Sequence, residues 1–340
     1  MADGAGDEAP VVNRNRDGSL GFSANATEKT MMPNTRVERA AMVASQEKDA
    51  PLVSVAVISF NQKDYIGQCL DSALRQTYRP LEIIVADDGS CDGTRDIILR
   101  YAANYPGIVV PVLASTNAGV TANSTAAHQA CTGKYIAWLG GDDIMVDDKI
   151  ARQVAVMEAD PLIAVCYHDL DVFDSATDAS LRRFSEMNRP REGGIETAIR
   201  YGTFNGGSAT MVRRACAPEC YDARILVASD WLYWVECLQG GGRIVYINAV
   251  LGRYRRHARN VTADTSAARL LLLDHLMTCA IILVRMPCYA GEVSHTTARL
   301  LVSLARRTKT GRMRLMLLAI STMVAAIFIS AVKVLLRLRG

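Results

Sequence analysis

Residues 54–94, SVAVISFNQKDYIGQCLDSALRQTYRPLEIIVADDGSCDGT, contain two short apolar runs separated by a segment whose apolar residues fall at helical spacing. Similar runs recur along the chain and begin 26 to 29 residues apart, at 52–59, 81–86, 108–113, 134–139 and 162–167. Each interval leaves room for one crossover helix. Short apolar runs that alternate with amphipathic segments predict an α/β fold, a Rossmann-like and mostly parallel sheet with helices on both faces.

The composition restricts the class of protein. The chain has 340 residues, of which 50% are hydrophobic and 21% charged, so it is too apolar to be disordered throughout. Residues 299–340 hold nine Lys or Arg and no Asp or Glu, which leaves 29 basic and 35 acidic residues in the rest of the chain. An acidic body argues against nucleic acid as a partner, because a protein that binds it needs a basic face.

The cysteines and the N-terminus indicate a reducing compartment. The nine cysteines include no CxxC pair and no zinc-ligand spacing, so they are expected to be reduced thiols. The N-terminus carries Asp3, Asp7 and Glu8 where a signal peptide would be basic, and no apolar run follows. We therefore expect a catalytic face in the cytosol.

Three loops that follow predicted strands carry polar, acidic or glycine-rich residues: 59–61 (SFN), 87–90 (DDGS) and 140–143 (GGDD). In open α/β sheets, ligands bind beyond the carboxyl ends of the strands. Four carboxylates at neighbouring strand ends repel one another unless a cation or hydrogen-bond donors lie there, and a Mg²⁺- or Mn²⁺-diphosphate supplies a cation. The sequence contains neither GxxxxGK[ST] nor GxGxxG after the first strand, which argues against a P-loop or dinucleotide site.

Residues 54–94, followed by 117–143 (NAGVTANSTAAHQACTGKYIAWLGGDD), resemble a family 2 glycosyltransferase with the GT-A fold, and the resemblance extends from residue 52 to about residue 260. It implies that the donor nucleotide is bound by Ser59, Phe60, Asn61, Asp88 and Asp142. Within this set Asp88 would hydrogen-bond the base and Asp142 would contact the ribose or the metal shell. Asp143 would hold the metal ion, from a loop that we expect to face solvent.

The sequence departs from the family pattern at two places. Gly140 and Gly141 stand where Leu-Asp or a similar pair often precedes the last two acids, which leaves the ribose contact open. Residues 123–125 (NST) stand where many relatives have an Arg or Asn that contacts the donor. Donor selectivity therefore cannot be inferred from that segment.

Farther along the chain, three segments match later parts of the family pattern. Residues 205–210 (NGGSAT) resemble the loop that walls the sugar pocket, or form a plain hairpin turn. Asp230 occupies the place of the catalytic base, with Ser229 in place of a first acid. Taken alone Asp230 is more typical of a helix N-cap, and the order of the motifs favours the base. Residues 252–262 (GRYRRHARNVT) resemble the YRxHxxN segment, so His257 would complete the metal shell and Arg255 would grip the diphosphate, the alternative being a basic surface loop.

The resemblance implies an inverting glycosyltransferase that moves a sugar from a UDP-, dTDP- or GDP-sugar to a hydroxyl of a glycan or lipid-linked acceptor, with Mg²⁺ or Mn²⁺. No QxxRW motif follows Asp230, which favours one transfer per encounter over processive synthesis. Two alternatives remain open. A sugar-nucleotidyltransferase would need a glycine- and lysine-rich loop after the first strand, and a catalytically silent GT-A-like binding module would not need the acidic residues.

The expected organisation has five parts. They are a flexible leader (1–50), a nucleotide-sugar-binding α/β subdomain (51–165), an acceptor-binding and catalytic part (166–262), a helical extension (263–312) and a basic-flanked hydrophobic helix (313–340). Residues 315–332 carry no charge and are flanked by five basic residues before and three after. This pattern predicts a membrane anchor with the body on the cytoplasmic face, the alternative being a buried terminal helix.

Overall fold

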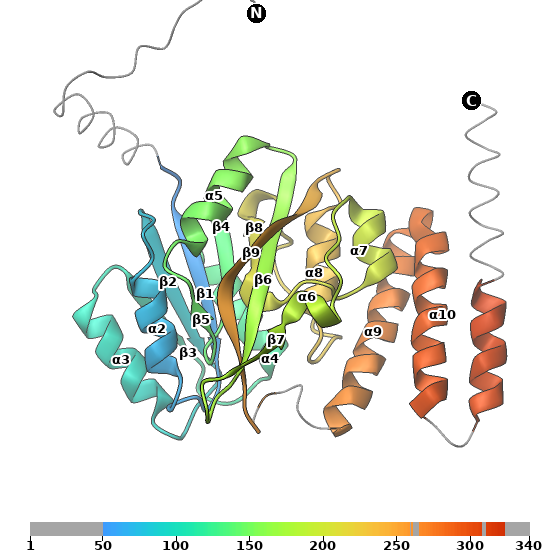
Figure 1. Ribbon diagram of the computed structural model, residues 1–340, viewed down its shortest axis with the longest axis horizontal. Helices are drawn as coiled ribbons and strands as arrows, with labels where there is room; N and C mark the ends of the chain where they lie inside the picture. The colour runs from blue at the N-terminus through green and yellow to red at the C-terminus, as the bar shows by residue number, and fades with distance from the viewer. Residues whose placement is uncertain (1–49, 259, 261–264, 308–310, 324–340) are drawn as a thin grey trace, which may run out of the picture. The chain divides into compact units, whose positions relative to one another are not determined.

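A nine-stranded mixed sheet positions the predicted loops (Figure 1). The computed structural model describes residues 50–258, 260, 265–307 and 311–323, and the predicted leader lies outside them. In the described chain the strand order is β3-β2-β1-β4-β8-β6-β9-β5, and β7 pairs with β6. The strands are β1 (Val53–Ser59), β2 (Leu81–Asp87), β3 (Val109–Leu113), β4 (Tyr135–Gly140), β5 (Ile144–Met145), β6 (Ile163–Asp174), β7 (Ser180–Arg183), β8 (Thr210–Arg213) and β9 (Arg243–Arg256).

Helices cover both faces of this sheet, as predicted. One buried cluster packs α2, α3 and α5 against one face, and a second packs α4, α7, α8 and α9 against the other. The helices are α2 (Ile66–Leu74), α3 (Thr94–Asn104), α4 (Val120–Ala130), α5 (Lys149–Ala159), α6 (Phe184–Met187), α7 (Ile195–Tyr201), α8 (Asp230–Cys237), α9 (Thr265–Arg285) and α10 (Ala290–Arg307). Three short 3₁₀ turns are η1 (Gly207–Ala209), η2 (Arg214–Cys216) and η3 (Pro287–Tyr289).

The first four strands are parallel and in register, which brings the three loops together. Ser59 at the end of β1 pairs with Asp87 of β2, and Ile58 pairs with Gly140 of β4. Apolar residues on both sides of these strands are buried, since helices cover both faces. The loops after β1, β2 and β4 therefore meet at one edge of the sheet.

The fifth apolar run does not continue the parallel series. It forms β6, which pairs antiparallel with β8 and parallel with β9, while β8 lies between β4 and β6. The spacing of apolar runs predicts that a strand exists but not which strand pairs with it. This insertion brings the ends of β8 and β9 beside the loop that follows β4.

The C-terminal helices pack on the body through both α9 and α10, and Thr296 of α10 donates a hydrogen bond to the carbonyl of Ile199 in α7 (2.8 Å). Asp274 of α9 is buried and accepts hydrogen bonds from the backbone N–H groups of Val227 (2.7 Å) and Ala228 (3.0 Å). Within the described residues no single helix is long and apolar enough to cross a membrane; Leu270–Arg285 and Pro287–Arg306 meet that criterion only as a pair bent by 120°. Of the predicted anchor, 313–340, only residues 313–323 are described, and 324–340 lie outside the described residues.

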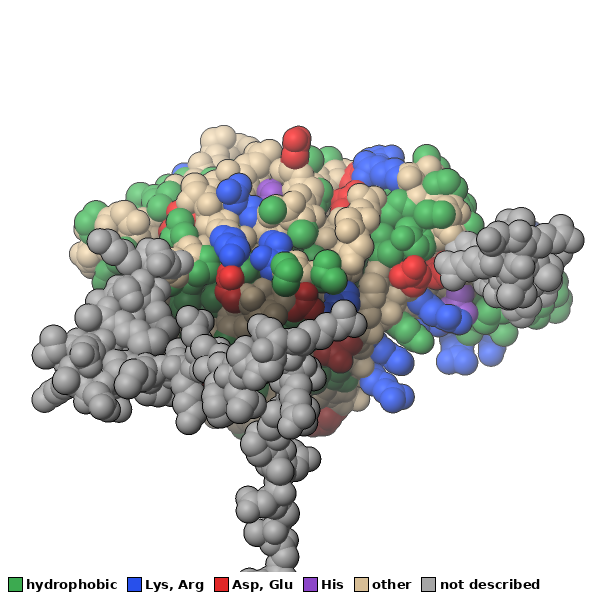
Figure 2. Space-filling model, turned by 90° about the horizontal axis from the view of Figure 1, so that it is seen from above, with side chains coloured by type: hydrophobic (Ala, Val, Ile, Leu, Met, Phe, Trp, Pro, Cys, Tyr) green, Lys and Arg blue, Asp and Glu red, His purple; other side chains and the backbone are tan. Residues whose placement is uncertain are grey.

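The end of the molecule at which β1 begins is seen in Figure 2. Basic and acidic side chains are intermixed on the part of this surface that the picture shows.

Candidate active site

The loops after β1 and β2 are joined by backbone and side-chain hydrogen bonds. The carbonyl of Ser59 accepts from the N–H of Asp88 (3.0 Å) and from Nδ2 of Asn123 (3.2 Å). Asn61 has a left-handed φ of 51°, donates its N–H to Ser90 Oγ (2.7 Å) and accepts from the N–H of Cys91 (3.1 Å). Phe60, in this turn, is 43% exposed. An aromatic ring that lines a ligand site has to be exposed in this way.

Ser59 is buried, and its hydroxyl has no hydrogen-bond partner among the described residues. A buried hydroxyl without a partner is costly, so this group is available to a ligand or to water. The assignment of Ser59, Phe60 and Asn61 to the nucleotide stays a prediction.

Asp88 is buried and holds the chain that leads into α4. Its Oδ1 accepts from the N–H of Ala118 (2.8 Å) and its Oδ2 from the N–H of Gly119 (2.9 Å). Each carboxylate oxygen has a further lone pair, so a contact with the base stays a prediction. The geometry gives Asp88 a task that the sequence did not predict, which is to position the N-terminus of α4.

Asp143 differs from the expectation of a solvent-facing carboxylate. It is 2% exposed, and its oxygens accept from Ser208 Oγ (2.5 Å) and from the N–H of Arg255 (2.8 Å). Burial, and then the neighbouring charge of Asp142, raise the pKa of Asp143 well above its ordinary value, although both hydrogen bonds oppose the shift. The expectation that its loop faces solvent was wrong, because the turn η1 and strand β9 cover Asp143.

Asp142 presents its carboxylate to the other predicted residues. The side chain is 14% exposed, and its Oδ2 lies 3.0 Å from His257 Nε2 and accepts from Asn260 Nδ2 (3.2 Å). The imidazole of His257 stacks on Tyr65, with 4.6 Å between the ring centroids. The structure thus brings together Asp142 and two residues of the YRxHxxN segment.

One carboxylate beside one imidazole fits a divalent cation that completes its shell with water and diphosphate oxygens. Asp142 and His257 lie in contact at this edge of the sheet, and the assignment of Asp143 and His257 to a metal stays a prediction. Within the described residues no group of three or more His, Cys, Asp or Glu side chains is arranged to hold a metal ion. A metal at this position would depend on the donor for part of its shell.

Arg255 is buried beneath this loop. Its Nε donates to the carbonyl of Asp142 (2.7 Å) and one terminal nitrogen donates to Gln68 Oε1 (2.6 Å). The guanidinium also lies over the rings of Tyr65 and Phe173, 4.9 and 4.7 Å from their centroids. These contacts make Arg255 a positioning residue for Asp142, and its predicted grip on the diphosphate stays a prediction.

The two glycines of the GGDD loop have a steric reason. A Cβ on Gly140 would lie 2.9 Å from Asp142 Oδ1 and 3.1 Å from Asp143 Oδ2, and one on Gly141 would lie 2.3 Å from Gln62 Oε1. A side chain at position 140 would push against the two carboxylates, and one at position 141 would push against Gln62 and the backbone of Ile58. Gly140 and Gly141, which depart from the family pattern, thus allow the loop to pack closely.

Asp230 is the first residue of α8. The preceding residue, Ser229, has its hydroxyl 2.9 Å from that of Thr121 in α4, and Asp230 Oδ1 accepts from the N–H of Trp231 (2.8 Å). Burial raises the pKa of Asp230 from 3.8 to about 6. A carboxylate with a raised pKa is suited to take up a proton near neutral pH.

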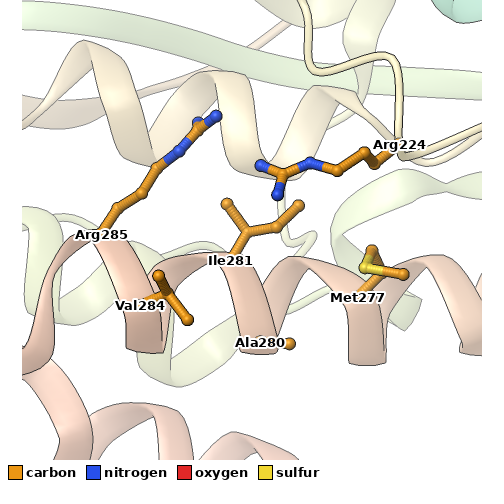
Figure 3. A pocket seen from close by; sticks show the side chains of 6 residues that line it. All are labelled: Arg224, Met277, Ala280, Ile281, Val284 and Arg285. Atoms are coloured by element: carbon orange, nitrogen blue, oxygen red, sulfur yellow. The ribbon is translucent and has the colours of Figure 1, made fainter.

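An apolar hollow on α9 lies apart from these loops (Figure 3). It is lined by Met277, Ala280, Ile281 and Val284, with Arg224 and Arg285 at its edge. Both arginines pair with Asp222. The lining contains no carboxylate, histidine or other proton-transfer group, so the acidic loops are the better candidate for the active site.

Comparison with known proteins supports the family and the fold. Residues 54–216 match the model of glycosyl transferase family 2. The chain is 30% identical, over 215 residues, to the putative teichuronic acid biosynthesis glycosyltransferase TuaG of Bacillus subtilis, covering 63% of this chain and 82% of that protein. The fold and site define a GT-A-like protein, and the chain belongs to glycosyl transferase family 2.

Of the other similar proteins, one is covered over a smaller share of its length and two solved structures are less identical in sequence. An uncharacterized Mycobacterium tuberculosis protein is 34% identical over 213 residues, which are 62% of this chain but only 60% of that protein. Staphylococcus aureus TarS 1-349 in complex with UDP-GlcNAc has a TM-score of 0.61 at 14% identity, with 82% of this chain and 81% of that chain covered. A Pyrobaculum calidifontis mannosyltransferase in complex with GDP-Man and Mn²⁺ has a TM-score of 0.50 at 17% identity, with 87% and 93% covered. Both structures support the fold.

Proposed function

We propose that the chain is an inverting glycosyltransferase that moves a sugar from a nucleoside diphosphate sugar to a hydroxyl of a glycan or lipid-linked acceptor. The observation that carries this proposal is the cluster of Asp142, His257 and Asn260 at the carboxyl ends of the parallel strands. Ligands of open α/β sheets bind at that edge. The transfer also requires a group that takes the proton of the acceptor hydroxyl. Asp230 is suited to this, because burial raises the pKa of its carboxyl to about 6.

The donor is a UDP-, dTDP- or GDP-sugar. The solved relatives support this range, since one was studied with UDP-GlcNAc and another with GDP-Man. Ser59, Phe60 and Asn61 would line the nucleotide site. Asp88 accepts hydrogen from an imide or amino group of a base, which does not by itself select the base.

The metal is Mg²⁺ or Mn²⁺, held by Asp142 and His257. When bound, it would neutralise the charge that develops on the diphosphate. Asn260 and the ring of Tyr65 orient these two side chains, and Arg255 holds the backbone of Asp142 in place. The Pyrobaculum calidifontis mannosyltransferase, which was crystallised with Mn²⁺ as well as GDP-Man, supports a divalent cation.

The transfer is a single displacement. Asp230 takes the proton from the acceptor hydroxyl, and that oxygen attacks the anomeric carbon as the bond to the diphosphate breaks. Because a single attack occurs opposite the leaving group, the configuration inverts. Positioning of the two substrates, together with stabilisation of the departing diphosphate, supplies most of the rate.

For the acceptor we propose only a class of molecule, and for the location only a face of the membrane. The names of two relatives, the teichuronic acid glycosyltransferase TuaG and the chondroitin synthase of Escherichia coli, support a role in polysaccharide synthesis. The basic residues that flank 315–332 favour association with the cytoplasmic face of a membrane, where a lipid-linked acceptor would be presented. Nucleic acid is not expected as a partner.

The two alternatives are less well supported. A sugar-nucleotidyltransferase would need a glycine- and lysine-rich loop after β1, and this chain has Ser59, Phe60 and Asn61 there. A silent binding module would not need a carboxylate beside an imidazole at the sheet edge.

One experiment separates the three. A panel of UDP-, GDP- and dTDP-sugars is incubated with the purified chain, with Mn²⁺, with Mg²⁺ or with a chelator, and nucleotide release is measured. The proposal expects metal-dependent release of nucleoside diphosphate from at least one sugar nucleotide. A second set of reactions supplies a nucleoside triphosphate and a sugar 1-phosphate, and release of pyrophosphate there would indicate the nucleotidyltransferase. No release in either set would indicate the silent module.

A further inference from the structure

Lys149, the first residue of α5, has no exposed surface, and its ammonium donates a hydrogen bond to the carbonyl of Ser208 (2.7 Å). One helical turn later, Gln153 donates from Nε2 to the carbonyl of Ala209 (3.0 Å). Residues four apart lie on the same face of a helix. The helix α5 therefore holds two successive carbonyls of the turn η1.

The turn η1 in turn holds the GGDD loop. Ser208 Oγ donates to Asp143 Oδ2 (2.5 Å) and accepts from the N–H of Gly140 (2.9 Å). Ser208 is thus bound by its carbonyl to Lys149 and by its hydroxyl to both ends of the loop that presents Asp142. A displacement of Ser208 would move the carboxylate that is proposed to bind the metal.

The position of Lys149 is unfavourable for stability in two ways. Transfer of an ammonium group out of water is costly, and burial lowers the pKa of Lys149 to about 7 although the carboxylate of Asp143 opposes the shift. A positive charge in the first turn of a helix is also disfavoured by the helix dipole. An apolar side chain of similar length would fill the same space without either cost.

We propose that Lys149 is a positioning residue for the metal and donor, and that it acts through Ser208 on the GGDD loop. The inference rests on the proposed function. The hydrogen bonds from Lys149 to Ser208 and from Ser208 to Asp143 carry it. Local groups that reduce stability without improving packing are typical of functional sites.

The test compares Lys149→Met with a matched variant, Lys134→Met, which removes an ammonium from an exposed ion pair with Glu158. Titration calorimetry measures the affinity for UDP and for GDP with Mn²⁺, and thermal unfolding measures stability. We expect Lys149→Met to lose roughly 10–100-fold in Mn²⁺-dependent affinity, as is typical when a group that orients metal ligands is removed. Its melting temperature is expected to change little, because loss of the hydrogen bond to the Ser208 carbonyl offsets the removal of a buried ammonium. Lys134→Met should keep the wild-type affinity.

A double-mutant cycle with Ser208→Ala tests the route of the effect. Without the Ser208 hydroxyl, the position of residue 208 no longer affects Asp143. The double variant should therefore lose no more affinity than the single variant that binds the nucleotide less tightly. Wild-type affinity in Lys149→Met, or losses that add, would overturn the role of Lys149. If the wild-type chain itself binds neither nucleotide, the proposed function fails and the inference fails with it.

Discussion

The two adjacent carboxylates Asp142 and Asp143 have different surroundings and therefore different tasks. Asp143 is enclosed and both of its oxygens bind groups of the protein, whereas Asp142 is partly exposed and faces His257 and Asn260. Like charges at neighbouring positions disfavour each other's ionisation, which contributes to the raised pKa of Asp143. We proposed the partly exposed member, Asp142, as the one that binds a cation.

Asp143→Ala should lower stability as well as activity. The substitution leaves the Ser208 hydroxyl and the Arg255 N–H without their acceptor, and a buried donor without a partner costs about 1–3 kcal/mol. Chemical denaturation monitored by circular dichroism measures the change in the free energy of unfolding. An Asp143→Ala chain as stable as the wild type would contradict the structural task given to this residue.

Asp230→Asn should abolish transfer and keep the affinity for the donor nucleotide, because the base acts on the acceptor. With a pKa of about 6, the wild-type carboxylate is protonated below that pH, so the rate should rise with pH through about 6 and then level off. The native state binds the proton more tightly than the unfolded chain, whose pKa is near 3.8, so the contribution of Asp230 to stability falls as pH rises between these values. The Asn variant should lack both dependences.

A pH–rate profile and a series of melting temperatures check this prediction. Retention of most of the transfer rate in Asp230→Asn would mean that the residue only begins α8 and that the base lies elsewhere.

For individual residues, the sequence predicted which ones share a site but not which are buried or what each one contacts. The motif order indicated Asp142, Asp143, Arg255, His257 and Asn260, and the structure brings them together. The motif order could not indicate which carboxylate is buried, because that depends on the turn η1 and strand β9, which lie far along the chain. Lys149 was missed, since a lysine at the start of an amphipathic helix usually faces solvent.

Among the elements, α4 links the two halves of the site. Asp88 holds the backbone just before this helix, Asn123 of the helix donates to the carbonyls of Ser59 and Ala86, and Thr121 lies beside Ser229. The nucleotide loops and the residue that precedes Asp230 thus rest on one helix. A change at one end of α4 can reach both substrates.

Asp88→Ala should weaken donor binding and also raise the mobility of the segment before α4, because the N–H groups of Ala118 and Gly119 lose their acceptor. Hydrogen exchange of residues 114–121 and titration with nucleoside diphosphate measure the two effects. A variant with weaker binding but unchanged exchange would indicate that Asp88 acts only on the base.

The regular spacing of apolar runs predicted β1 to β4 and the helices between them, because in this part of the chain each βαβ unit is formed by consecutive residues. It did not predict the pairing of β6, β8 and β9. Those contacts join segments far apart in the sequence, and they decide how the GGDD loop is covered.

For the molecule as a whole, charge is distributed unevenly along the sequence. All nine charged residues within 299–340 are basic, whereas acidic residues outnumber basic ones elsewhere. A basic segment that also contains the uncharged stretch 315–332 is expected to favour the cytoplasmic face of a membrane.

Cell fractionation tests this location. The full chain is expected in the membrane fraction, and a chain that ends at Thr310 is expected in the soluble fraction. Equal membrane binding of the two chains, or a soluble full chain, would contradict the assignment of the C-terminal segment.

The central claim is that this member of family 2 binds a nucleoside diphosphate sugar through a metal held by Asp142 and His257. Titration of UDP, GDP and dTDP into the wild-type chain and into Asp142→Asn, each with and without Mn²⁺, tests it most directly. We predict that at least one nucleotide binds the wild-type chain more tightly when Mn²⁺ is present, and that Asp142→Asn loses this gain while it keeps its fold. Binding that does not depend on Mn²⁺, or a gain that survives in Asp142→Asn, would contradict the claim.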